Sequence, residues 1–375
     1  MQVQSECKPV TADIFCRVVD NFGDIGVCWR LARRLAHGRG WSVRLWVDDL
    51  ASFSVLAPAI TPDLPAQTID GITVRQWDDQ SDEPALQVVI EAFACDPPAE
   101  FIAAMRATHP VWINLEYLSA EAWVESCHGL PSQQPSGLVK HFFFPGFTAA
   151  TGGLIREPGL SAARDAWQAD RPAQNEFLRR LGVPESVIAR RHAGARLATL
   201  FCYPQAPAAD LARALAALPE GAILLVPQGV APALDGVALS GLDIVRVPFV
   251  PQPDFDRLLW LADLNLVRGE DSFVRAAWAG RPFLWQIYPQ QDAVHLTKLD
   301  AWLARYDLPA PARALMQAWN ASAATDVATL AGAALADGPW QAWENTAREW
   351  DKAQAAPPDL GDTLADFCTD LSKTR

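Results

Sequence analysis

The fold class that the sequence predicts is α/β, with two doubly wound domains in one chain. Apolar strands alternate with helical segments twice, first over residues 13–147 and again over residues 197–287. Continuous apolar strands separated by helices are typical of parallel sheets that are covered on both faces. The length of 375 residues also favours two domains over one. We therefore expect two Rossmann-like domains, followed by a helical tail.

The first half contains apolar segments of strand length with helical segments between them. We predict strands at residues 13–19, 42–47, 86–94, 110–118 and 140–147, and helices at residues 25–38 and 99–108. A polar, helical stretch at residues 156–195 follows, and it contains no apolar strand. We interpret that stretch as the connection between a first domain over residues 1–155 and a second over residues 196–339.

The second half repeats the alternation of strand and helix. We predict strands at residues 197–203, 222–227, 243–250, 264–269 and 282–287, and helices at residues 209–219, 254–262 and 271–280. The last 70 or so residues have a wholly helical pattern. Gly and Pro interrupt it at residues 337–340 and 356–362, so we expect helix boundaries there.

Composition and charge exclude several classes of function. The net charge is −13, whereas nucleic acids and anionic membranes attract clustered Lys and Arg. No run of about 18 apolar residues indicates a membrane helix, and the first residues do not resemble a signal peptide, so we expect a cytoplasmic protein. The seven cysteines form no CxxC pair, and we expect them to be reduced, with Cys16 and Cys202 in the core. We expect no metal site.

The turn after the first strand combines two acids with two glycines. Asp20 and Asp24 alternate there with Gly23 and Gly26. Ligands bind at the carboxyl ends of strands in such folds, and glycine lets the backbone approach a ligand closely. A dinucleotide fingerprint needs GxGxxG, but this turn has only GxxG, and its carboxylates stand where a pyrophosphate would sit. The two acids suit a different task, which is to bind a cation, orient a nucleophile and take its proton.

A structural explanation of the same residues is helix capping. Either Asp20 or Asp24 is a suitable cap for a helix that begins near Ile25. Capping accounts for one acid but not for both, so we favour the functional interpretation.

The second domain contains a similar strand–turn–helix motif over residues 264–280. Its turn has the sequence RGEDS, which comprises Arg268, Gly269, Glu270, Asp271 and Ser272. We expect Ser272 or Asp271 to cap the following helix, whose N-terminus would then bind an anion. Arg268 would add a charge-assisted donor for phosphate. The alternative is an ordinary capped helix with a solvated Glu270.

Residues before that motif are suited to binding a nucleobase. Phe249 lies between two prolines in the string VPFVPQPDFDRLL, three residues before Gln252. An aromatic ring can stack on a base, and a glutamine amide offers both a donor and an acceptor. Taken alone, Phe249 is more often a core residue. Tyr203 ends the first strand of the second domain and is expected at the same crevice.

Together these segments resemble one known family. The strings DIFCRVVDNFGDIGVCWRLARRLA, LWVDDL, VIEAFACDPP, INLEYLSAE, TGGLIRE, VPFVPQPDFDRLL and RGEDSFVRA occur in order over nearly the whole chain. They resemble the EarP family, the bacterial protein-arginine rhamnosyltransferases that modify translation elongation factor P. The stretch at residues 156–195 matches least.

The resemblance implies a GT-B glycosyltransferase fold in which two Rossmann-like domains face an interdomain cleft. It implies dTDP-β-L-rhamnose as donor, one arginine of elongation factor P as acceptor, inversion at the anomeric carbon, and no metal or other cofactor. The modified factor would then rescue ribosomes stalled on polyproline sequences. In such folds the last helices, here residues 340–375, pack back on the first domain.

The resemblance also implies roles for individual residues. Asp24 matches the general base, Asp20 lies at the reaction centre, and Glu270 is needed for activity. We assign donor binding to a larger set: Phe22, Gly23, Tyr203, Phe249, Gln252, Arg268, Gly269, Asp271 and Ser272.

A guanidinium acceptor explains why the first turn is acidic. The acceptor is a cation, which carboxylates attract, but it holds its proton with a pKa above about 12. Its proton therefore has to move as the C–N bond forms, with Asp24 as base and Asp20 orienting the acceptor. Two rival functions remain at this point: a GT-B transferase acting on a small molecule or glycan, and a non-catalytic nucleotide-sugar-binding protein.

Overall fold

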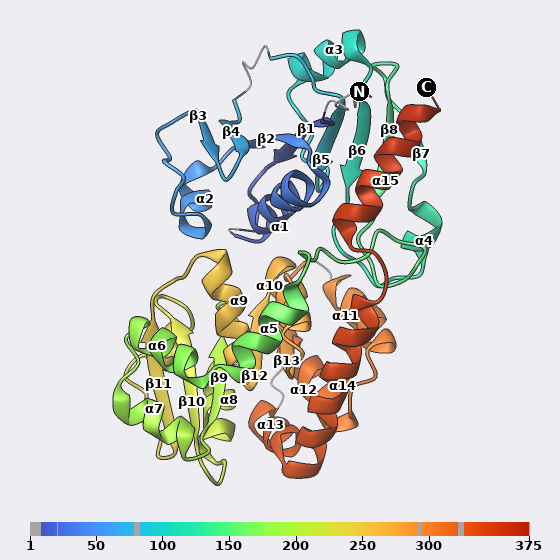
Figure 1. Cartoon of the computed structure of the whole chain (residues 1–375). Coiled ribbons are helices and arrows are strands. Elements are labelled where there is room, and N and C mark those ends of the chain that lie inside the picture. Colours follow the sequence, from blue (N-terminus) through green and yellow to red (C-terminus); the bar gives the residue numbers. More distant parts are fainter. Residues whose placement is uncertain (1–8, 21, 79–82, 291–293, 322–325, 375) are drawn as a thin grey trace, which may run out of the picture. The chain divides into compact units, whose positions relative to one another are not determined.

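The computed structural model of the chain describes residues 9–20, 22–78, 83–290, 294–321 and 326–374. It divides into two compact units (Figure 1). Unit 1 comprises Met1–Pro158 and Pro357–Arg375, and unit 2 comprises Gly159–Ala356. Each unit is an α/β structure with its own sheet.

Unit 1 is built on a mixed sheet with the strand order β3-β4-β2-β1-β5-β6-β8-β7. Its strands are β1 (Thr11–Cys16), β2 (Ser42–Val47), β3 (Ala66–Ile69), β4 (Ile72–Gln76), β5 (Val88–Ala92), β6 (Val111–Leu115), β7 (Pro131–Gln133) and β8 (Val139–Phe143). Its helices are α1 (Gly23–Arg33), which continues as a π-helical turn over Arg34–Gly38, α2 (Leu50–Leu56), α3 (Ala99–Thr108), α4 (Trp123–Cys127) and α15 (Leu360–Lys373).

Among the described strands of unit 1, the central ones pair in parallel, and the edge strands β3 and β7 pair antiparallel with β4 and β8. The strands β5 and β6 are buried along their whole length, as expected for a sheet covered on both faces. Their carboxyl ends therefore lie along one edge together with the end of β1, which Arg17 follows directly.

Unit 2 contains a sheet with the order β11-β10-β9-β12-β13, in which every described pairing is parallel. Its strands are β9 (Arg196–Leu200), β10 (Ala222–Pro227), β11 (Leu242–Val247), β12 (Leu264–Arg268) and β13 (Phe283–Gln286). Its helices are α5 (Leu160–Ala169), α6 (Arg171–Arg180), α7 (Glu185–His192), α8 (Ala208–Ala216), α9 (Gln252–Leu261), α10 (Asp271–Trp278), α11 (Val294–Arg305), α12 (Ala310–Asn320), α13 (Val327–Leu335) and α14 (Asp337–Ala355), with a 3-10 turn at Pro232–Leu234.

The α/β prediction is confirmed, and every strand and helix predicted for the two alternating series is present. The β3–β4 hairpin and the short strand β7 were not predicted from the sequence. Cys16 and Cys202 are buried free thiols, as expected. Among the described residues, none of the helices has the length and apolar character of a membrane span.

Residues 156–195 are more than a connection between domains. Nearly all of that stretch lies in unit 2, because the first segment of unit 1 ends at Pro158. Apolar side chains of α6 and α7, Phe177, Leu178 and Ile188 among them, pack into one core cluster with Leu197 of β9 and Leu225 of β10. The helices α6 and α7 therefore cover a face of the second sheet.

The helical tail divides between the units. Trp340 and Trp343 of α14 are buried within unit 2, whereas we expected all of residues 340–375 to pack on the first domain. The helix α15 belongs to unit 1, where Figure 1 shows it beside β6 and β8. The backbone N–H of Leu360 donates to the carbonyl of Leu154 (3.1 Å), which fixes the start of α15 against the same unit.

Candidate active site

The acidic turn of unit 1 follows the carboxyl end of β1 and leads directly into α1. Gly23 donates its N–H to the carbonyl of Asp20 at 2.7 Å, and Gly26 donates to the carbonyl of Phe22 at 2.9 Å. A Cβ atom on Gly23 would lie only 3.2 Å from Oδ2 of Asp20. Glycine at this position therefore allows the Asp20 carboxylate to lie over the start of the helix.

Neither acid of this turn is the helix cap. The N-cap of α1 is Phe22, whose own side chain makes no capping hydrogen bond. The capping alternative considered from the sequence is therefore wrong. Asp24 lies inside the first turn of the helix, and its side chain reaches back to the segment that precedes the helix.

Asp24 is buried, with an exposed fraction of 2%. Its Oδ2 accepts hydrogen bonds from the backbone N–H groups of Val19 (2.8 Å) and Asp20 (2.9 Å). Its Oδ1 accepts a hydrogen bond from the Tyr117 hydroxyl (3.1 Å). A carboxylate has about four acceptor positions, so these contacts occupy three of them. The remaining position is the one at which Asp24 can accept a further proton or donor.

Another acid supports the same turn from the neighbouring strand. Asp48 follows β2, and its Oδ1 accepts the backbone N–H of Val18 at 2.8 Å. Asp20 itself is half-buried. The carboxyl ends of β1 and β2 therefore present acidic side chains, which attract a cationic group and repel a phosphate.

In unit 2, the RGEDS turn joins β12 to α10. Gly269 has a φ of 67°, a left-handed conformation that glycine adopts without strain. Its N–H donates to the carbonyl of Gln286 at 3.2 Å, and its carbonyl accepts the indole N–H of Trp285 at 2.8 Å. Strand β13 thus binds both the N–H and the carbonyl of Gly269.

The expected capping of α10 is wrong. Glu270, rather than Asp271 or Ser272, is the N-cap, and the Glu270 side chain makes no capping hydrogen bond. Asp271 and Ser272 occupy the first turn of the helix and are nearly buried. The N-terminal end of α10, where the helix dipole favours an anion, therefore lies directly after the turn.

Arg268 is held against two aromatic rings. Its guanidinium carbon lies 4.5 Å from the ring centroid of Phe201 and 4.8 Å from that of Tyr203. Its Nη1 donates to the carbonyl of Cys202 at 3.1 Å. An arginine fixed in this way has less side-chain entropy to lose when it binds an anion.

Phe249 also contacts this aromatic group. Its ring meets Phe201 edge to face, with centroids 6.2 Å apart, while Tyr203 meets Tyr288 in the same geometry at 5.7 Å. Phe249 is 42% exposed, so the alternative that it is a core residue is wrong. The structure therefore brings Tyr203, Phe249 and Arg268 together around Phe201.

A buried ion pair joins α9 and α10, the two helices that carry the remaining residues expected to bind the sugar donor. Gln252 begins α9 and is buried. Farther along α9, Asp256 accepts two hydrogen bonds from Arg275 of α10, from Nε at 2.8 Å and from Nη2 at 2.7 Å. A buried bidentate pair of this kind fixes both distance and angle, so Gln252 and the start of α10 keep a constant spacing.

Three residues of these groups were not predicted from the sequence. Phe201 directly follows β9 and Tyr117 follows β6 by two residues, so their positions at the carboxyl ends of strands could have identified them. Tyr288, two residues beyond β13, could have been found in the same way. Within the described residues, no group of three or more His, Cys, Asp or Glu side chains is arranged to hold a metal ion.

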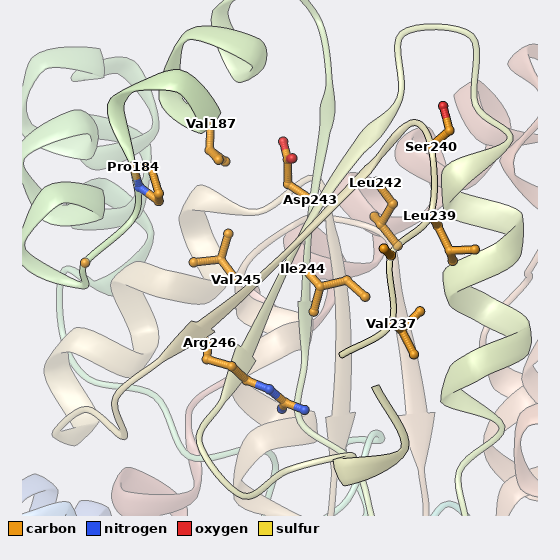
Figure 2. Close-up of a pocket in the computed structure, with 12 residues that line it drawn as sticks. Pro184, Val187, Val237, Leu239, Ser240, Leu242, Asp243, Ile244, Val245 and Arg246 are labelled. Atoms are coloured by element: carbon orange, nitrogen blue, oxygen red, sulfur yellow. The ribbon is translucent and has the colours of Figure 1, made fainter. Parts of the chain in front are cut away.

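A groove of about 620 Å³ elsewhere in unit 2 is separate from these residues. Figure 2 shows it along β11, with side chains from the segment before α7 and from the loop before β11. The charged groups there have partners, since Asp243 pairs with Arg190 and Arg246 with Asp235. None of the predicted site residues lines this groove, so we do not assign it to the candidate active site.

Comparison with known proteins identifies one family. The family model described as "Elongation-Factor P (EF-P) rhamnosyltransferase EarP" matches residues 12–369. A protein-arginine rhamnosyltransferase of Pseudomonas aeruginosa is 45% identical, over 96% of this chain and 98% of that protein. One of Pseudomonas putida is 47% identical, over 95% of this chain and 98% of that protein.

Solved structures agree with the fold. One, described as the structural basis for EarP-mediated arginine glycosylation of translation elongation factor EF-P, has a TM-score of 0.63 and 34% identity, covering 96% of this chain and 99% of that one. MurG of Acinetobacter baumannii has a TM-score of 0.56 at 14% identity, covering 97% of this chain and all of that one, and shows the fold alone. These structures confirm the GT-B glycosyltransferase fold that the sequence predicts.

Proposed function

Because the chain belongs to the EarP family of elongation-factor P rhamnosyltransferases, we propose that it transfers L-rhamnose from dTDP-β-L-rhamnose to one arginine of elongation factor P. The transfer inverts the anomeric carbon and uses no metal. The observation that carries this proposal is the buried Asp24 carboxylate, which keeps one acceptor position while three donors hold it. The reaction takes place in the cytoplasm, where the modified factor relieves ribosomes stalled on polyproline.

The acceptor half of the reaction belongs to the acidic turn of unit 1. A guanidinium is a poor nucleophile because its lone pairs are delocalised and its pKa exceeds about 12. As the new C–N bond forms, that nitrogen becomes far more acidic, and Asp24 accepts its proton at the remaining acceptor position. Asp20 holds and orients the cation, so that the nitrogen approaches the anomeric carbon in line.

The donor half of the reaction belongs to unit 2. Phe249 offers an exposed ring for stacking on thymine, and Gln252 and Tyr203 complete the base and sugar contacts. The leaving diphosphate is stabilised by Arg268 and by the N-terminal end of α10 at Asp271 and Ser272. Gly269 gives that turn its left-handed shape, and we place Phe22 and Gly23 of unit 1 on the donor side as well. Glu270, the N-cap of α10, is the third residue that we propose for catalysis.

Intact-mass spectrometry of elongation factor P tests the proposal directly. The factor is incubated with this protein and dTDP-rhamnose, and we expect one added deoxyhexose. A factor in which the acceptor arginine is replaced by lysine should gain no mass, and a reaction with EDTA should proceed at the same rate.

The same assay separates the two rival functions. A non-catalytic nucleotide-sugar-binding protein would leave the mass of the factor unchanged and would not consume the donor. A transferase for a small molecule or glycan would also leave the factor unchanged, but it would consume the donor once its own acceptor was supplied. Either result would contradict the proposal.

A further inference from the structure

Tyr117 makes a contact to which the proposed reaction assigns no role. It follows β6 by two residues, and its hydroxyl donates to Oδ1 of Asp24 at 3.1 Å. Its side chain is 39% exposed, although large aromatic side chains are usually well buried. The hydroxyl thus reaches the candidate base from a ring that solvent or a bound partner can touch.

The ring of Tyr117 lies flat on a residue with unusual backbone geometry. The rings of Phe93 and Tyr117 stack with centroids 4.2 Å apart and an angle of 11° between their planes. Phe93 has a φ of 59°, and Ala94 and Asp96 have φ values of 52° and 49°. Left-handed backbone is a genuine outlier for a bulky residue, and such residues cluster at functional sites.

Strand β6 holds both partners of this stack. The N–H of Phe93 donates to the carbonyl of Leu115 at 2.7 Å, and the N–H of Ala94 donates to Oδ1 of Asn114 at 3.0 Å. Asn114 is 1% exposed, so this second contact comes from the core of the sheet. The left-handed segment is therefore fixed to the same strand that leads into Tyr117.

The consequence is that Asp24 is held through both of its oxygens. The backbone N–H groups of Val19 and Asp20 bind Oδ2, and the Tyr117 hydroxyl binds Oδ1. Rotation about the Cβ–Cγ bond moves both oxygens, so the two backbone contacts on Oδ2 already oppose it, and the Tyr117 contact on Oδ1 narrows the plane of the carboxylate further. The direction of the remaining acceptor position is then defined as well, and proton transfer depends steeply on that geometry.

We propose that Tyr117, seated on Phe93, is a positioning residue that fixes the plane of the Asp24 carboxylate for proton transfer from the acceptor. The inference rests on the proposed function, because it is the transferase reaction that gives Asp24 a proton to accept.

A double-mutant cycle in the transfer assay tests the inference. Tyr117→Phe keeps the ring stack and removes only the hydroxyl. We expect kcat to fall by roughly 10–100-fold, the scale of loss for a misplaced catalytic group, with the KM for the donor within about twofold of wild type.

In the Asp24→Asn background, followed over long incubations, Tyr117→Phe should lower kcat little further, because the carboxylate that Tyr117 positions is already lost. Tyr306→Phe, which removes a buried hydroxyl within unit 2, is the matched control and should leave both constants unchanged.

Failure of the inference and failure of the proposed function give different results. Tyr117 does not position the base if the wild-type protein transfers rhamnose and Tyr117→Phe is equally fast. The same conclusion follows if Tyr117→Phe costs as much in the Asp24→Asn background as it does in the wild-type protein. If the wild-type protein makes no product, the proposed function fails. In that case the Tm values of the two single variants and the double variant still test the contact between Tyr117 and Asp24. Additive changes in Tm would show that the hydroxyl and the carboxylate do not interact.

Discussion

Asp24 has two tasks at once, and this affects how a substitution must be interpreted. Its Oδ2 binds the N–H groups of Val19 and Asp20 and so shapes the turn, while its remaining acceptor position is available for chemistry. An alanine would remove both tasks together. An asparagine retains one oxygen for the backbone N–H groups, so it is the more informative change.

We expect Asp24→Asn to lower turnover by roughly 10²–10⁴-fold, the range for loss of a general base. Affinity for dTDP-rhamnose should change little, because the donor contacts are proposed mainly in unit 2. Initial rates by mass spectrometry and donor titrations by calorimetry measure the two quantities. Asp49→Asn is the matched control, since Asp49 accepts the N–H of Ser52 at the start of α2 (2.9 Å) and asparagine caps a helix equally well. Near-normal transfer by Asp24→Asn would show that its role is only structural.

Phe249 is the exposed member of the aromatic group in unit 2. Phe249→Ala should weaken dTDP-rhamnose binding by about 1–3 kcal/mol, the range for loss of a stacked base, and should lower the Tm less than the loss of a fully buried phenylalanine would, because the residue is 42% exposed. Calorimetry with dTDP-rhamnose and with dTDP alone measures the effect. Val237→Ala, at an exposed apolar residue of the separate groove in Figure 2, should bind the donor normally. Equal affinity of Phe249→Ala and wild type would remove Phe249 from the donor site.

At the scale of elements, local sequence patterns predicted most of what is present. Buried parallel strands are continuous apolar runs, so β5, β6 and β10 could be found from the sequence alone. The β3–β4 hairpin was missed because its strands are short and only partly buried, which leaves no long apolar run. The capping residues of α1 and α10 were predicted wrongly because the N-cap positions are occupied by Phe22 and Glu270, whose side chains make no capping hydrogen bond. In α1 the acid of the first turn, Asp24, instead binds the backbone of the segment before the helix and the Tyr117 hydroxyl.

His128 gives unit 1 a dependence on pH. It follows α4, and its Nδ1 accepts the backbone N–H of Phe144 at 3.1 Å. Its ring also contacts Phe143 of β8 and Phe367 of α15. Burial lowers the pKa of His128 below its usual value. A protonated Nδ1 could not accept the Phe144 N–H, so the folded protein favours the neutral ring.

The stability of unit 1 should therefore fall as the pH drops below about 6.5, the unperturbed value for histidine. Between that pH and the lowered pKa, the unfolded chain binds more protons at this ring than the folded chain, so acid favours unfolding. In His128→Asn the amide oxygen can accept the same N–H without titrating. We expect the Tm of wild type to fall more than that of His128→Asn between about pH 7.5 and about pH 5.5, a window that spans the unperturbed value. Parallel curves for the two proteins would contradict this role of His128.

At the scale of the whole molecule, contacts between distant parts of the chain are what the sequence did not predict. The Tyr117–Asp24 contact spans 93 residues and the Arg34–Asp359 contact spans 325, and neither follows from a local pattern. The motifs placed Asp20, Asp24 and Arg268 at strand ends because that position is a local property of a strand–turn–helix unit. Which side chains then meet there depends on strand order, and the sequence alone does not give that order.

The longest of these contacts anchors α15. Arg34, at the end of α1, is buried and binds Asp359 through Nε (3.1 Å) and Nη2 (2.7 Å), and its Nη2 also lies 2.6 Å from Oδ1 of Asp362. There is no room for larger residues around it. A Cβ atom on Gly38 would lie 1.8 Å from Nη1 of Arg34, and one on Gly361 would lie 2.4 Å from its Cγ.

Ending the chain after Ala356 should therefore unfold unit 1 and spare unit 2. The truncation removes both carboxylate partners of Arg34 together with the chain that packs against its side chain. It also uncovers the apolar surface against which Leu360, Leu364 and Cys368 pack. These losses approach the whole stability of a domain, about 5–15 kcal/mol. Because α14 belongs to unit 2, that unit keeps all of its helices.

Hydrogen exchange should show rapid exchange in β1, β5 and β6 and retained protection in β9, β10 and β12. A chain that ends after Lys373, which keeps all of α15, is the matched control and should match wild type. Protection of β1 and β5 in the shorter chain would show that unit 1 folds without α15.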